Sequence, residues 1–126
     1  MPAVVTTGTG EMEARLNNAA TALDYTLSYE DLEGADTFFA HIHLGQEDVN
    51  GGVIAFLCGG GGKDPCPDVS GTVTESITAA DVIGPAGQGI AAGEFGDLLG
   101  ALRRGAVYAN VHTDKHPSGE IRGQLK

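Results

Sequence analysis

Short segments in which apolar and polar residues alternate constrain the fold of this chain most. Residues 106–113 alternate in this way, and the turn residues of 114–119 follow them. Side chains point to opposite faces along a strand, so the alternation predicts a strand with one apolar face. The apolar face, predicted to point into a core, carries Val107, Val111 and Thr113; the other face carries Tyr108, Asn110 and His112.

The same alternation recurs along the chain and predicts further strands, and the continuous apolar run 53–58 also predicts a strand. The predicted strands are 11–16, 22–30, 37–44, 53–58, 69–77, 106–113 and 120–125. Residues 94–103 differ, because Phe95, Leu98 and Leu102 are at helical spacing. We therefore expect one all-β domain over residues 1–126, an antiparallel Greek-key β-sandwich or flattened barrel with one short inserted helix.

The last predicted strand, residues 120–125, closes the chain as the return strand of a hairpin. By period two, Ile121 and Leu125 point inward. Glu120 and Arg122 then point outward together, which predicts a solvated surface ion pair. An arginine with a functional partner is the alternative.

The charge of the chain excludes some partners. The formal net charge is −10 and the pI is near 4.5. Such a surface repels phosphate backbones and anionic lipids, so we expect no nucleic-acid partner and no membrane partner. No apolar run approaches the length of a transmembrane helix. A cationic ligand such as a metal ion is attracted.

The two cysteines, Cys58 and Cys66, flank a glycine-rich segment. An even count at close spacing favours a disulfide, and therefore a secreted, periplasmic or extracellular protein. Two free thiols in a cytosolic protein, or a metal-binding pair, remain as alternatives. Residues 1–5 do not read as a signal peptide, so we expect a mature or trimmed form with an added start Met.

All four histidines fall in two places, which is the strongest chemical signal in the sequence. His41 and His43 are two residues apart on one predicted strand, so their rings project from the same face. His112 is at a polar-facing position of another strand, and His116 is in the loop after it. Imidazole donors without a thiolate suit copper or zinc. We expect a metal site of His41, His43 and His112, with His116 as a fourth ligand.

Four polar residues can orient these rings: Asn110, Asp48, Asp114 and Glu120. The segment 60–63 is not a phosphate loop, and the sequence has no Gly-x-Ser-x-Gly elbow. No catalytic residue is assigned, and the sequence leaves open whether the protein is an enzyme.

The chain resembles the chordin-type domain, CHRD, and the resemblance covers nearly the whole chain. Three segments carry it. They are AHIHLGQEDVNGGVIAFLC, SGTVTESITAADVIG and LGALRRGAVYANVHTDKHPSGEIRGQL. This domain occurs in the developmental regulator chordin and in many bacterial and archaeal exported proteins, so the resemblance implies export. Family members usually begin with another strand, of which only residues 1–3 remain here. We expect an exposed sheet edge, through which a homo-oligomer can form.

The histidine-bearing strands also resemble copper/zinc superoxide dismutase more weakly. In that Greek-key barrel, a His-x-His strand and a later Val-His strand supply copper ligands, which implies copper at His41, His43 and His112. The bridging histidine and the zinc-site sequence of that enzyme have no counterpart here. Two alternatives remain. One is a metal-free interaction or self-assembly module, in which His112 is a structural residue. The other, with the least support, is a copper-dependent enzyme similar to superoxide dismutase.

Overall fold

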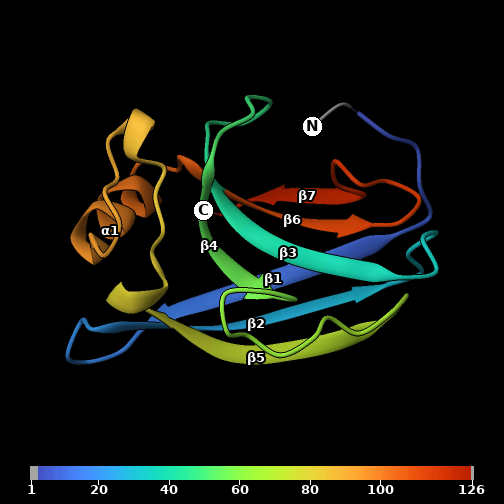
Figure 1. Ribbon diagram of the computed structural model, residues 1–126, viewed down its shortest axis with the longest axis horizontal. Helices are drawn as coiled ribbons and strands as arrows, with labels where there is room; N and C mark the ends of the chain where they lie inside the picture. Colours follow the sequence, from blue (N-terminus) through green and yellow to red (C-terminus); the bar gives the residue numbers. More distant parts are fainter. Residues whose placement is uncertain (1–2, 126) are drawn as a thin grey trace.

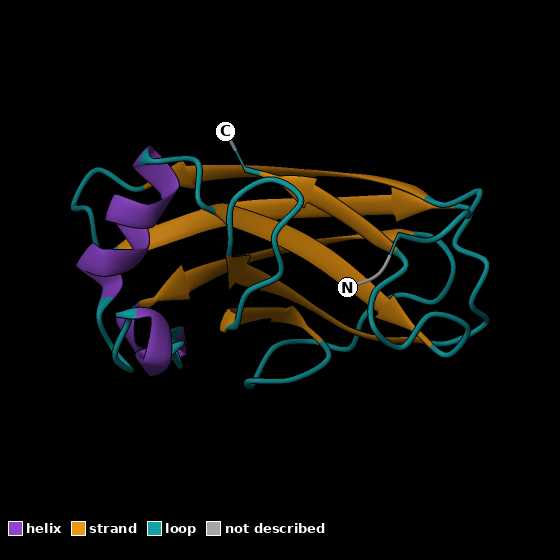
Figure 2. Ribbon diagram, turned by 90° about the horizontal axis from the view of Figure 1, so that it is seen from above, coloured by secondary structure: helices purple, strands orange, loops and turns teal. Residues whose placement is uncertain are grey.

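The computed structural model describes residues 3–125, which form two antiparallel sheets packed face to face (Figures 1 and 2). The first sheet has the order β1 (Thr9–Leu16), β2 (Ala22–Glu30), β5 (Gly71–Thr78). The second has the order β4 (Val53–Cys58), β3 (Thr37–Leu44), β6 (Val107–Thr113), β7 (Ile121–Gln124). The predicted all-β sandwich is confirmed. Met1 and Pro2, on which the prediction of a shortened first strand partly rests, lie outside the described residues.

The connections follow the predicted Greek-key order. The chain passes from β3 through β4 and β5, and β6 then returns to lie beside β3. Two 3₁₀ turns, Ala79–Asp81 and Ala86–Gln88, and the helix α1 (Phe95–Arg103) occupy the long connection from β5 to β6. This return places the histidines of β3 next to those of β6.

The core fills the space between the sheets, as period two predicts. On β2 the inward residues Leu23, Tyr25 and Leu27 are at most 4% exposed. Opposite them lie apolar residues of the second sheet, including Ile42 and Val111. Each fully buried Leu or Ile side chain contributes roughly 1.5–3 kcal/mol to folding.

Strand β4 reads as continuously apolar because its pairing with β3 is irregular. The register shifts between Ala40 and His41, and again between Ile42 and His43. Such bulges let neighbouring residues of one strand point the same way. Ile54 and Ala55 are therefore both buried, while Phe56 reaches the outer face and contacts the His41 ring.

Helix α1 closes one end of the sandwich (Figure 2). Its residues Phe95 and Leu98 are buried, as their helical spacing predicts. Gly105, with a φ of 68°, follows the helix and turns the chain into β6.

The predicted outward position of Glu120 and its ion pair with Arg122 are wrong, whereas Arg122 does point to the outer face, where it lies over the Tyr108 ring. Glu120 is only 2% exposed and precedes β7, so the strand alternation does not apply to it. Its carboxylate accepts hydrogen bonds from the backbone N–H groups of Glu33 and Gly34 and from the hydroxyl of Thr113. No ion pair joins Glu120 to Arg122 among the described residues.

Cys58 and Cys66 form the predicted disulfide, which joins the end of β4 to the loop before β5. Within residues 3–125, no helix is long and apolar enough to span a membrane.

Candidate metal centre

The outer face of the four-stranded sheet, turned away from the core, carries the histidines. Strands β3 and β6 pair there so that His41 is opposite Asn110 and His43 is opposite Tyr108. His112 is opposite Phe39, one outward position further along β6. His112 is thus the diagonal neighbour of His41, a separation that ring-bearing side chains can bridge.

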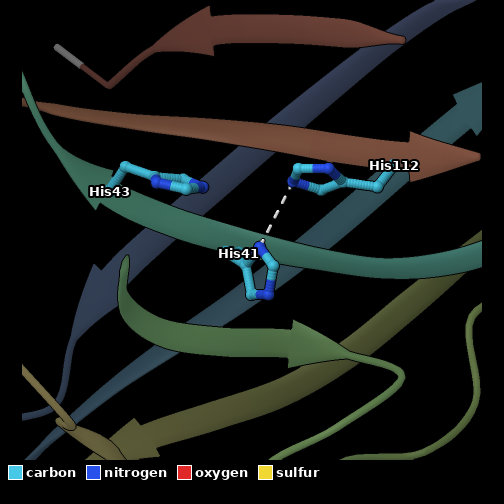
Figure 3. A group of neighbouring side chains, drawn as sticks. All are labelled: His41, His43 and His112. Atoms are coloured by element: carbon cyan, nitrogen blue, oxygen red, sulfur yellow. Dashed lines mark hydrogen bonds between the residues drawn. The ribbon is translucent and has the colours of Figure 1, made fainter. Parts of the chain in front are cut away.

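The three rings converge from two strands (Figure 3). His43 and His112 point toward one another from opposite sides, and the His41 ring lies below them in this view, with one nitrogen directed toward His112. One nitrogen of each ring belongs to a group of atoms that all lie within 4.8 Å of one another. His41 Nδ1 and His112 Nε2 are 3.3 Å apart. Two ligands of one tetrahedral ion at bond lengths of 2.0–2.1 Å are separated by a similar distance, about 3.4 Å.

Backbone carbonyls determine the tautomers of two rings. His43 Nδ1 is 3.0 Å from the oxygen of Gly51, and His112 Nδ1 is 2.8 Å from the oxygen of Pro117. A carbonyl oxygen only accepts, so each Nδ1 carries the ring proton and donates it. The Nε2 atom of each ring then keeps a lone pair directed into the group. This arrangement, a ring nitrogen held by a carbonyl, is usual for metal-ligating histidines.

Burial keeps the three rings neutral. His41, His43 and His112 are only 6–8% exposed. For His41, burial and the neighbouring rings of His112 and His43 lower the pKa to about 4. Burial also lowers the pKa of His43 and of His112, although hydrogen bonds from their rings to Gly51 and Pro117 act in the opposite direction. Neutral imidazole is the form that binds a metal ion.

A stack of planar groups supports His43. The Tyr108 ring lies on the His43 ring, with centroids 4.8 Å apart and planes 3° apart. The guanidinium carbon of Arg122 lies 3.5 Å from the centre of the Tyr108 ring. Arg122 also donates to the oxygens of Gln46 and Val49, in the loop 45–52. Arg122 therefore ties this loop to the ring that stacks on His43.

Aromatic rings from β3 and β4 enclose the other side of the group. The Phe39 ring is 4.8 Å from the His41 ring and 4.9 Å from the His112 ring. The Phe56 ring is 4.4 Å from that of His41. These apolar neighbours exclude water and lower the local dielectric, so a cation here interacts strongly with its ligands.

The structure brings together three of the four predicted ligands. His116 lies in the turn between β6 and β7 and is outside the group defined by distance. Its backbone N–H donates to the Thr113 hydroxyl, and its carbonyl accepts from Gly119. Its Nε2 is buried without a hydrogen-bond partner among residues 3–125.

Of the four residues predicted to orient the rings, only Asn110 contacts them within the described part of the chain. Asp114 accepts from the backbone N–H of Asp36, and Glu120 belongs to its own network. Tyr108 and Arg122 were not predicted as supporting residues. The alternation of β6 and β7 places both residues on the face that carries the histidines. Their contact with each other depends on how β6 pairs with β7, which the structure shows.

Comparison with known families identifies the chain at the level of its family. The model of the CHRD domain matches residues 1–125. The chain therefore belongs to the CHRD domain family, as its sequence resemblance implies. No curated protein and no solved structure matches it, so the weaker resemblance to superoxide dismutase gains no support.

Proposed function

We propose that this CHRD-domain protein is exported and binds one copper ion through His41, His43 and His112, with zinc as the alternative metal. The observation that supports this most is the convergence of three buried, neutral imidazoles whose ligand atoms lie within 4.8 Å of one another. Three nitrogen donors without a thiolate suit copper(II) and zinc. The role is metal binding, transfer or storage.

Two further features support the proposal. The net charge of −10 attracts cations to the surface. The Cys58–Cys66 disulfide is typical of an oxidising compartment outside the cytosol, where a protein meets metals without competition from the reducing thiol pool.

Elemental analysis after metal loading and desalting tests the proposal. We expect about one equivalent of copper or zinc in the unaltered protein, and none in the double variant His41→Ala, His43→Ala, because two of the three ligands are gone. His116→Ala is the matched control, since it removes a histidine outside the group. Unchanged metal content in the double variant contradicts the proposed site, and loss in His116→Ala extends it to four histidines.

The second candidate function is self-assembly, and an open edge of the sandwich favours it. Strands β1 and β7 are edge strands, and a groove of about 530 Å³ runs between them. Apolar residues Met12, Ile121 and Leu125 line it. Exposed edges of this kind pair with another chain. Sedimentation velocity over a range of concentrations separates a dimer of this chain from a monomer, and Ile121→Lys should abolish the dimer.

A further inference from the structure

The side-chain oxygen of Asn110 lies at hydrogen-bond distance from two of the three rings in the histidine group. It lies 2.9 Å from His43 Nε2 and 3.0 Å from His112 Nε2. Asn110 is only 3% exposed. It is opposite His41 in the register of β3 and β6, so its side chain projects from the same face as all three rings.

The protons of the two rings are already committed elsewhere. Each neutral imidazole has one N–H, and the carbonyls of Gly51 and Pro117 take those of His43 and His112. The backbone carbonyls of Gly51 and Pro117 are fixed in orientation, whereas the side-chain amide of Asn110 can rotate to present either its oxygen or its NH₂ group. In the structure the Asn110 amide presents its oxygen to the Nε2 lone pairs of His43 and His112, so that three acceptors meet at hydrogen-bond distance. Such a cluster is stable when a positive charge lies among its members.

Three of the separations in the group match those of ligands around one ion. Adjacent ligands at bond lengths of 2.0–2.1 Å are separated by about 2.9 Å at right angles and about 3.4 Å at the tetrahedral angle. The contacts of the Asn110 oxygen, 2.9 and 3.0 Å, and the contact of His41 with His112, 3.3 Å, all fall in this range.

We infer that the side-chain oxygen of Asn110 is the fourth ligand of the proposed metal site and makes it selective for a divalent ion. The inference rests on the proposed function of the three histidines. A neutral amide oxygen is a hard donor, which favours copper(II) and zinc(II); copper(I) prefers soft sulfur ligands and gains little from it. Asn110 thus determines which oxidation state of copper the protein holds.

The alternative is that Asn110 only positions the rings. Its amide then has the opposite orientation, with the NH₂ group donating to both Nε2 atoms. In this arrangement the residue contacts no metal, and its removal weakens every metal alike. The two arrangements differ in metal selectivity and in the environment of the side-chain carbonyl.

Affinities of zinc(II), copper(II) and copper(I) for Asn110 variants test the inference. In Asn110→Ala we expect the two divalent ions to bind about tenfold more weakly or worse, with copper(I) nearly unchanged. In Asn110→Asp, whose shape is nearly the same, the carboxylate should bind the divalent ions at least as tightly. Asn18→Ala, at an exposed turn, is the matched control. Equal loss for all three ions, or unchanged divalent affinity in Asn110→Ala, overturns the inference.

The side-chain carbonyl can be observed directly in the zinc-loaded protein. Ligation should shift the ¹³C resonance of the Asn110 side-chain carbonyl when zinc binds, while that of Asn18 stays in place. An Asn110 carbonyl resonance that does not move in a protein that has bound zinc overturns the inference. If the unaltered protein binds none of the three ions, the proposed function itself has failed.

Discussion

The two sheets of the sandwich have outer faces of opposite character. On the three-stranded sheet the outward residues are polar or charged, and some of them pair across strands in the open: Ser28 with Thr72 at 3.1 Å, and Thr26 with Thr74 at 3.4 Å. On the four-stranded sheet the outward residues are aromatic rings, histidines and Asn110, and His41 is only 6% exposed. Both faces are turned away from the core, yet only the first is solvated.

The difference shows where function departs from folding. An antiparallel sheet needs one buried face and can leave the other to solvent. The three-stranded sheet follows this rule. The second sheet buries polar rings on the face that could be solvated, which costs free energy unless those groups are satisfied. We attribute this cost to a metal site.

Metal addition should have the largest effect on stability. The free energy of unfolding should rise by about 4 kcal/mol at a free metal concentration a thousand times the Kd, because only the folded chain presents the three rings together. Thermal melts with and without zinc measure it. A rise of the same size in His112→Ala would mean that the metal binds elsewhere.

Replacement of Glu120 by Gln should lower the free energy of unfolding by about 1.5–3 kcal/mol at neutral pH. The carboxylate holds Thr113 at the start of the turn that supplies the Pro117 carbonyl to His112. Denaturant unfolding measures the loss. Glu13→Gln, on the exposed face of β1, is the matched control and should change little.

The same network predicts a pH dependence. Burial alone raises the pKa of Glu120, but hydrogen bonds from Thr6, Glu33, Gly34 and Thr113 outweigh it and lower the pKa below its ordinary 4.5. Because the folded state favours the carboxylate, its contribution is present above pH 4.5 and is lost as the pH falls through the lowered value. The difference in stability between Glu120→Gln and the unaltered protein should therefore shrink below pH 4.5. A constant difference would show that the charge of Glu120 does not contribute.

Replacement of Arg122 by Ala should cost about 1 kcal/mol of stability and about tenfold in metal affinity. The change removes the cation above Tyr108 and frees the loop 45–52, whose Gly51 carbonyl holds His43. Zinc titration of the variant measures the affinity. Arg122→Lys should recover only part of it, because an ammonium lacks the planar fork. Equal zinc affinity in Arg122→Ala and in the exposed-site control Arg15→Ala would show that the stack of Arg122 on Tyr108 does not contribute to metal binding.

Ser28→Ala should have the smallest effect, within about 0.5 kcal/mol, since its partner Thr72 can turn to solvent. Denaturant unfolding measures it beside His41→Ala. If Ser28→Ala lowered the free energy of unfolding more than His41→Ala did, the proposed contrast between the two outer faces would be wrong.

Much of the fold follows from the sequence because period two is a local property. Strands 22–30 and 37–44 were predicted from this alternation, and 53–58 from its continuous apolar run, with the bounds that the structure shows. The convergence of His41, His43 and His112 was also predicted, because residues two apart on a strand share a face and His112 is at a polar-facing position of another strand.

What the sequence did not reveal depends on register and turns. Glu120 was placed outward because the alternation was extended past the first residue of β7, where the chain is still turning toward the backbone of Glu33. The position of His116 depends on the same turn. The stack of Arg122 on Tyr108 depends on the pairing of β6 with β7, which no single-strand pattern specifies.

An anomalous difference map from crystals soaked in zinc or copper tests the central claim most directly. The account predicts one strong peak on the outer face of the four-stranded sheet, bonded at about 2.0–2.1 Å to nitrogen atoms of His41, His43 and His112. A soaked crystal without a peak at these three rings, or with its only strong peak at surface carboxylates, would contradict it.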